Sequence, residues 1–156
     1  MLNSDVVVTM MYVVKGITVI GMLFLCSGCM KYQQPVRLKV SSDSCLNISD
    51  SAESLPVVLK VYELSDETAF AKASFEELWK RDAQVLGNTV KGKYEYTILP
   101  DQVERFAFKK QNDTQMIGFM ATFRNPEKSS WKKVIKVPSG IRPRAIRLSL
   151  KDNELT

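Results

Sequence analysis

Short runs in which apolar and polar residues alternate recur along most of the chain, and they restrict its possible folds more than any other feature. In the first run, VRLKV, the three apolar residues face one side of an extended chain and the two basic residues face the other, as in a strand with one buried face. Turn signals such as Pro100-Asp101 and Asn125-Pro126 separate the runs. The seven runs are residues 36–40, 57–64, 94–99, 103–109, 116–124, 131–137 and 144–150. This pattern predicts a mainly β fold, an antiparallel β-sandwich of about seven strands.

Residues 65–88 interrupt the pattern, because β-branched residues are rare there and helix-forming residues predominate. Ser74 and Glu77 have the spacing of a capping box, in which the hydroxyl accepts from an amide three residues on and the carboxylate reaches back. Gly87-Asn88 can end a helix. The sequence therefore predicts a small helical insertion between the second and third strands.

An apolar run near the start of the chain ends in the stretch LFLCSGCMKY. Lys15 precedes the run, and the small residues Ser27 and Gly28 lie directly before Cys29, as a signal peptidase requires. The run is shorter than the roughly 20 apolar residues of a membrane-spanning helix. We therefore expect residues 1–28 to be a signal peptide that is cut between Gly28 and Cys29.

The expected cleavage site resembles the lipobox of bacterial lipoproteins, Leu-(Ala/Ser)-(Gly/Ala)-Cys, although Cys26 stands where the lipobox has leucine. This resemblance implies that Cys29 is the lipid-modified first residue of the mature chain, carrying diacylglycerol and palmitate. Met30 after it implies sorting to the outer membrane. The translation start stays open among Met1, Met10 and Met11. The predicted organisation is a signal peptide at 1–28, a lipidated tether at 29–35, a β-sandwich domain at 36–150 with the helical insertion at about 65–88, and a C-terminal tail at 151–156.

Residue types exclude several classes of function. The chain has no His, so a Ser-His or Cys-His nucleophile pair cannot form. A structural zinc site needs four Cys or His ligands, and besides the C-x-x-C pair only Cys45 is present. Acid–base catalysis would need a carboxylate pair such as Glu76 or Glu77 with Asp82, and beside a capping motif we interpret these charges as solvated. We expect no enzyme activity, no metal and no cofactor.

The charge of the chain is mildly positive. The formal net charge is +5, and removal of residues 1–28 leaves it unchanged because that segment holds one acid, Asp5, and one base, Lys15. The remaining basic residues are scattered rather than gathered in one tract. We therefore expect no nucleic-acid partner, and a weak attraction to anionic lipid headgroups is reasonable.

Two blocks of the chain resemble a known family. The first joins Tyr62 and Leu64 to Phe70 and to RDAQVLG at 81–87, and the second is IGFMATFRNPEKSSW at 117–131. Together with the lipobox, they are similar to the TssJ family (also called VasD or SciN), the outer-membrane lipoprotein of the bacterial type VI secretion system. The similarity runs from about residue 36 to residue 150. It departs from the family at Asp101, where glycine is usual, at Lys132, where arginine is usual, and at Cys45.

The resemblance implies a transthyretin-like β-sandwich with added helices and no enzymatic activity. It also implies a lipid-anchored position on the periplasmic face of the outer membrane. There the protein would anchor the secretion membrane complex by binding the periplasmic C-terminal region of TssM, with TssL in the same complex. The contact usually implicated is the loop between the first two strands, here residues 41–56. No small-molecule substrate is expected.

The 41–56 loop is longer than a typical hairpin connection of 2–5 residues and rich in Ser, Asp and Asn. Its apolar residues have two interpretations: they pin the loop to the sandwich edge, or they anchor a partner. The candidate partner-binding residues are Leu46, Asn47, Ile48, Ser49, Asp50, Ser51 and Leu55. Because loop entropy depends weakly on length, we expect residues 47–53 to be removable with little loss of stability.

Two other functions stay open. The chain could be a lipid-tethered module that binds carbohydrate or cell wall, which an exposed aromatic platform would support, or a pilotin-like chaperone that carries a client to the outer membrane. Tyr62 and Trp131 are expected in the core and the aromatic residues fall mostly on inward-facing positions, which argues against such a platform.

Overall fold

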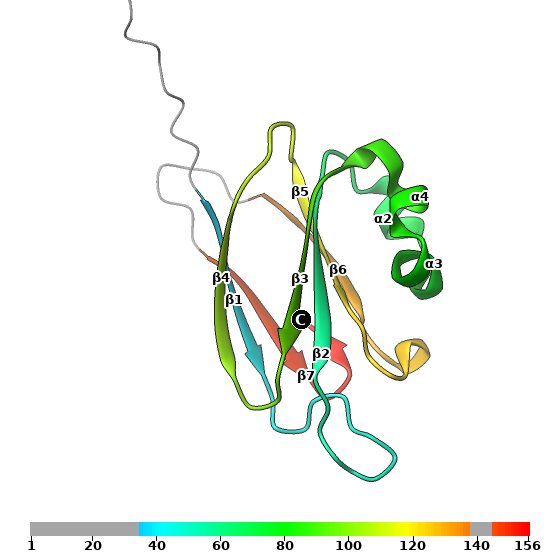
Figure 1. The fold of residues 1–156 in the computed structure, drawn as a ribbon, viewed down its shortest axis with the longest axis vertical. Coiled ribbons are helices and arrows are strands. Elements are labelled where there is room, and N and C mark those ends of the chain that lie inside the picture. The colour runs from blue at the N-terminus through cyan, green and yellow to red at the C-terminus, as the bar shows by residue number, and fades with distance from the viewer. Residues whose placement is uncertain (1–34, 138–144) are drawn as a thin grey trace, which may run out of the picture. The chain divides into compact units, whose positions relative to one another are not determined.

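The computed structural model describes residues 35–137 and 145–156. Cys29, the predicted signal peptide and most of the predicted tether therefore lie outside the described residues. Two four-stranded sheets face each other, with strand orders β4-β1-β7-β8 and β3-β2-β5-β6 (Figure 1). The strands are β1 (Pro35–Ser42), β2 (Val57–Leu64), β3 (Val90–Ile98), β4 (Val103–Lys109), β5 (Met116–Ala121), β6 (Lys132–Lys136), β7 (Ile146–Lys151) and β8 (Glu154–Leu155). The prediction of a mainly β sandwich is confirmed.

The alternation of apolar and basic residues along β1 decides which face of its sheet meets the core. Val36, Leu38 and Val40 are buried between the sheets, whereas Arg37 between them is exposed. In contrast, seven of the eight residues of β2 are buried, because one face of β2 meets the core and the other lies under the helices. Figure 1 shows these helices on the side of the second sheet.

The helical insertion consists of α2 (Thr68–Lys72), α3 (Phe75–Lys80), α4 (Asp82–Leu86) and the 3-10 turn η1 (Gly87–Thr89). The predicted capping box is present at the start of α3, where Glu77 N donates to Ser74 Oγ and Ser74 N donates to the Glu77 carboxylate. The buried side chains of the insertion form a second cluster with residues from the outer face of the sheet. This cluster consists of Tyr62, Leu64, Phe70, Ala73, Leu78, Leu86 and Met120.

Two contacts hold α2 close to the sheet. Gly118 lies under the ring of Phe70, and a Cβ at residue 118 would come within 3.0 Å of that ring, so glycine permits this close approach. From β6, Lys132 Nζ donates hydrogen bonds to the carbonyls of Ala71 and Ala73 at 2.6 and 2.8 Å. These carbonyls lie at the end of α2 and have no partner within the helix.

Two features of the sheets were not apparent in the sequence pattern. Among the described strands, β1 and β7 pair in parallel whereas the other pairs are antiparallel. The eighth strand, β8, lies within residues 151–156 and places Leu155 opposite Leu150, with Leu155 buried. A strand of two residues is too short to produce a detectable period.

A buried carboxylate near the end of β2 forms no ion pair with the described residues. Glu63 on β2 has no exposed surface. It accepts hydrogen bonds from Tyr94 Oη at 2.9 Å, from Thr114 Oγ1 at 2.7 Å and from Gln111 N at 2.8 Å. Burial, and then the hydrogen bond to Glu63, raise the pKa of Tyr94 to about 12. Glu63 thus ties β2 to β3 and to the connection between β4 and β5.

Candidate functional site

The loop between β1 and β2 is partly built into the sandwich. Leu46 is fully buried and belongs to the core between the sheets. Asn47, also buried, has a left-handed backbone (φ 50°), which Asn tolerates better than most residues. Its side-chain amide donates to the Pro56 carbonyl at 3.2 Å, and its side-chain oxygen accepts from Arg124 N at 2.9 Å. The interpretation in which apolar residues pin the loop is therefore correct for Leu46.

The next residues of the loop face outward. Ile48 is 37% exposed and is one of four exposed large apolar side chains among the described residues, with Trp79, Leu99 and Val103. Ser49 stabilises a turn within the loop. Its Oγ accepts a hydrogen bond from Glu53 N, and its backbone forms hydrogen bonds with Ala52 N and with the Glu53 carbonyl. Asp50 and Ser51 lie exposed at the tip, and Leu55 is half-buried where the chain returns to β2. The loop thus presents one apolar side chain beside polar ones on a fixed backbone.

The contacts of Asn47 argue against the expectation that residues 47–53 can be removed with little loss of stability. The backbone N of Asn47 donates to the Asp152 carbonyl at 2.8 Å, in addition to its two side-chain hydrogen bonds. Removal of this residue would leave buried polar groups of the neighbouring segments without partners, which costs about 1–3 kcal/mol per group. The sequence pattern could not show this, because a polar residue in a long loop is usually solvated.

A groove of about 890 Å³ adjoins the loop. It lies between α3 and the connection from β5 to β6, which contains the short turn η2 (Pro126–Lys128). Arg124 lines the groove and also forms an ion pair with Asp50 of the loop at 2.8 Å. The groove and the loop therefore share a side chain and form one continuous surface.

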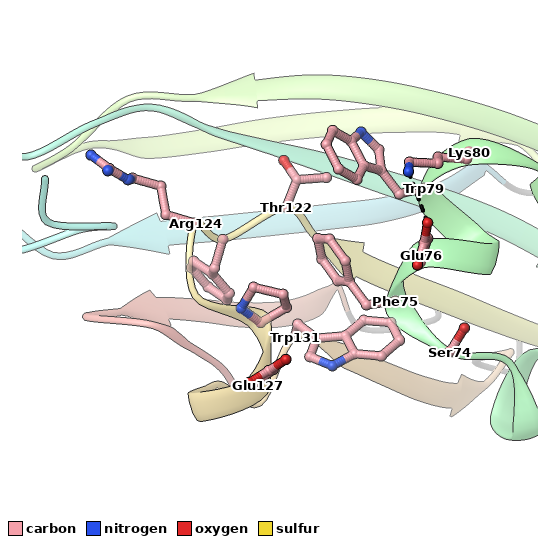
Figure 2. A pocket seen from close by; sticks show the side chains of 11 residues that line it. Ser74, Phe75, Glu76, Trp79, Lys80, Thr122, Arg124, Glu127 and Trp131 are labelled. Carbon is pink, nitrogen blue, oxygen red and sulfur yellow. Dashed lines mark hydrogen bonds and ion pairs between the residues drawn. The ribbon is translucent and has the colours of Figure 1, made fainter.

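Four aromatic side chains line the groove: Phe75, Trp79, Phe123 and Trp131. Figure 2 shows Phe75 beside both tryptophans, with ring centroids 5.2 Å from Trp131, edge to face, and 5.9 Å from Trp79. Both Tyr62 and Trp131 are expected in the core. Tyr62 is buried, whereas Trp131 is half-buried and packs against the core from its edge. Trp79 is 55% exposed. Sequence reasoning missed this residue, although its position next to Leu78 on a short capped helix puts it on the outer face.

A group of charged residues lies between the insertion and the sheet. Lys93 Nζ is 2.7 Å from Asp82 Oδ2 and 3.1 Å from Glu95 Oε1. The buried Lys60 approaches the same two carboxylates at 3.9 Å and donates to the Trp79 carbonyl. Burial alone would raise the pKa of Asp82, but hydrogen bonds from Lys93 and Tyr62 outweigh it and lower the pKa. This network attaches α4 to the sheet.

The three acids considered for catalysis each have a different partner. Glu76 accepts from Lys80, Glu77 caps α3 through Ser74, and Asp82 belongs to the network with Lys93. Their geometry is thus that of helix-stabilising and bridging charges. Cys45 is a free, exposed thiol. Within residues 35–137 and 145–156, no helix has the length and apolar character needed to cross a bilayer.

The fold is similar to solved structures of secretion lipoproteins. The crystal structure of the T6SS lipoprotein TssJ1 from Pseudomonas aeruginosa has a TM-score of 0.73 at 25% identity, over 80% of this chain and 94% of that chain. Serratia marcescens Lip, a membrane bound component of the Type VI Secretion System, has a TM-score of 0.72 at 19% identity, over 78% of this chain and 95% of that chain. A matching chain also occurs in a structure described as the T6SS protein TssM C-terminal domain from EAEC. Its TM-score is 0.66 at 19% identity, over 78% of this chain and 95% of that chain.

No curated protein matches the sequence. Residues 34–153 match the family described as type VI secretion lipoprotein, VasD, EvfM, TssJ, VC_A0113. This match covers β1 to β7, including the loop, the helical insertion and the groove between them. The chain therefore belongs to the type VI secretion lipoprotein family.

Proposed function

We propose that this protein is a non-enzymatic lipoprotein of the outer membrane that binds the periplasmic C-terminal region of TssM and so anchors the type VI membrane complex, which also contains TssL. Cys29 would be the lipidated residue and residues 1–28 the signal peptide. The family match supports a lipoprotein of this secretion system. A chain of this fold in a structure described by the TssM C-terminal domain supports TssM as the partner.

The observation that carries the proposal is the construction of the β1–β2 loop. Buried Leu46 and Asn47 hold its backbone, so the loop presents exposed Ile48 without a large ordering cost on binding. A single apolar side chain on a rigid support, with polar residues around it, resembles the hot spots of protein interfaces. The groove with Trp79 extends the same surface through Arg124.

The position of the loop suits a partner that approaches the end of the domain far from the tether. β1 begins at Pro35, directly after the predicted tether, and ends at Ser42, where the loop begins. Eight residues of strand span about 26 Å. Figure 1 shows the loop at the end of the sandwich opposite to the start of β1. The loop would therefore lie about one strand length from the tether, where a periplasmic partner can reach it.

The anchor is tested by fractionation of the full-length chain. Cys29→Ser should leave the precursor uncut or release the domain from outer-membrane fractions, because acyl chains contribute about 0.8 kcal/mol per buried CH₂. Cys26→Ser is the matched control and should fractionate as the wild type, since residue 26 would be discarded with the signal peptide. Outer-membrane attachment of Cys29→Ser at the wild-type level would contradict lipidation at this residue.

The partner is tested by purification of the tagged lipoprotein from membranes of cells that carry the secretion system. We expect TssM to co-purify with it and to be identified by mass spectrometry. Loss of a single client from the outer membrane when the gene is deleted, without a TssM complex, would favour the pilotin-like alternative.

A second candidate function rests on exposed Trp79. An exposed indole beside charged Lys80 and Glu76 at an open groove can stack on a sugar ring. In that case Trp79→Ala should abolish retention on peptidoglycan or other glycans and leave TssM capture unchanged. The opposite pattern would assign the groove to the protein partner.

A further inference from the structure

The outward face of the first sheet carries a row of three cations across three strands. In the strand register, Lys39 on β1 lies opposite Arg105 on β4 on one side and opposite Arg147 on β7 on the other. All three residues point away from the core, since their neighbours along each strand are buried or half-buried on the inner face. Like charges placed directly opposite each other destabilise a sheet, so this row is unfavourable for the domain in isolation.

The row belongs to a larger basic face of six residues. Its members are Arg37, Lys39, Arg105, Lys109, Arg147 and Lys151. The other outward positions of β4, β1 and β7 hold apolar or hydroxyl side chains such as Ala107 and Ser149. Six positive charges exceed the net charge of +5 of the whole chain.

None of these six cations forms an ion pair with the described residues, although Lys151 interacts with Asp43 at the end of the face. The ion pairs found among these residues all involve other cations. The nearest acid in the register is Glu154 on β8, opposite Lys151 at the end of the face. The helices lie beside the other sheet and do not cover this one (Figure 1). No described helix covers the basic face (Figure 1), so this face can meet an anionic surface from outside.

We propose that the basic face lies against the anionic lipid headgroups of the membrane that holds the protein. The proposal rests on the lipid anchor at Cys29. From Cys29 to Pro35 the chain can span at most about 20 Å, and Pro35 begins β1, the strand at the middle of the basic face. A short tether thus keeps this face near the headgroups, where each Lys or Arg close to an anionic surface favours contact roughly fivefold.

A broad sheet face suits a membrane surface better than a small anion, because the cations are spread over three strands rather than gathered around a cavity. Contact of this face would fix the rotation of the sandwich on its tether. The β1–β2 loop would then take one direction relative to the membrane, which lowers the orientational cost of partner capture.

The test uses the full chain, processed and lipidated, purified from membranes and reconstituted into vesicles. A Cys45→Ser background removes the exposed thiol, and Ser149→Cys carries a dye on the basic face. A headgroup nitroxide lipid quenches the dye according to its distance. Vesicles contain phosphatidylcholine alone or phosphatidylcholine with about 30% phosphatidylglycerol, and each sample is repeated in about 0.5 M NaCl, where charge interactions are screened. A dye at Lys72→Cys on α2 reports the helical side.

We expect stronger quenching at residue 149 in anionic vesicles than in neutral ones, loss of the difference in high salt, and no increase at residue 72. The triple variant Lys39→Gln, Arg105→Gln, Arg147→Gln should weaken the contact of the basic face with anionic vesicles roughly a hundredfold, because each of the three lost cations contributes a factor of about five. Quenching at residue 149 should then fall to the level seen with neutral vesicles. The matched triple variant Lys72→Gln, Lys91→Gln, Lys128→Gln removes the same charge elsewhere and should behave as the wild type. Thermal unfolding of the first triple variant should occur at an equal or higher temperature, because like-charge repulsion is relieved.

Three results would overturn the proposal, and they separate it from the anchor. If the protein floats with the vesicles but quenching at residue 149 is the same in neutral and anionic lipid, the anchor stands and the basic face does not bind lipid. If the triple variant keeps its orientation but loses TssM capture, the face binds an acidic protein instead. If the chain does not incorporate into any vesicle, the anchor itself is wrong, and the basic face loses its tether to the membrane.

Discussion

At the scale of single residues, the structure contains charges where the sequence pattern predicted a covered strand. Lys60 and Glu63 lie in the run VVLKVYEL and are both buried. The partners of Lys60 come from α3 and α4 and from β3, and those of Glu63 come from β3 and the β4–β5 connection. Burial of these residues was predictable from the run, but their partners were not, because nothing in a local period identifies residues that are 19 to 51 positions away.

The pKa of Asp82 leads to a prediction about acid stability. Burial raises this pKa, but hydrogen bonds from Lys93 and Tyr62 outweigh burial, so the folded-state pKa lies below the usual 3.8. The corresponding stability is fully present above the unfolded-state pKa, about 4, and is lost as the pH falls through the folded-state pKa. Asp82→Asn should lower the free energy of unfolding by about 2 kcal/mol at pH 7.

Urea unfolding between about pH 3 and pH 7 measures this effect. The difference in the free energy of unfolding between the wild type and Asp82→Asn should become smaller as the pH falls below about 4, because the wild type then loses the stability that the Asp82 charge contributes. Glu127→Gln removes an exposed acid and serves as the control, with stability expected to follow the wild type throughout. If the free energies of unfolding of Asp82→Asn and the wild type differ by the same amount at every pH, the charge of Asp82 does not contribute to stability.

At the scale of elements, local signals were predictive where one segment decides its own structure. The Ser74–Glu77 spacing correctly predicted the start of α3, and the period of VRLKV correctly predicted the inward face of β1. The parallel pairing of β1 with β7 depends on segments that are far apart in the chain, so no local period encodes it. The β1–β2 loop reverses the usual rule, since polar Asn47 is buried and apolar Ile48 is exposed.

This reversal predicts that two neighbouring residues of the loop have different effects on stability. Asn47→Ala should lower the free energy of unfolding by about 2 kcal/mol, because it removes two side-chain hydrogen bonds of a buried residue. Ile48→Ala should change it by less than about 0.5 kcal/mol, since the side chain is substantially exposed. Urea unfolding of both variants under one set of conditions makes the comparison. Equal destabilisation by the two variants would mean that Ile48 belongs to the fold rather than to a binding surface.

At the scale of the whole domain, the described part of the chain has distinct surfaces that serve different roles in our proposals. The basic face of the first sheet would meet lipid, and the loop with the adjoining groove would meet the protein partner. The helical insertion covers the second sheet and supplies Trp79 to the groove. The family resemblance led to the loop as a candidate, but the groove could not be predicted, because it forms only where α3 meets the β5–β6 connection.

The most direct test of the central claim is the affinity of the mature protein for the periplasmic C-terminal region of TssM, measured by calorimetry for two matched variants. Ile48→Asp and Val103→Asp each replace a large exposed apolar side chain by an acid, one in the loop and one on β4. We predict that Ile48→Asp weakens binding about tenfold or more, the effect of losing an interface anchor, with unfolding unchanged. Val103→Asp should bind as the wild type does. Wild-type affinity of the Ile48→Asp protein would contradict the claim that the loop is the contact with TssM.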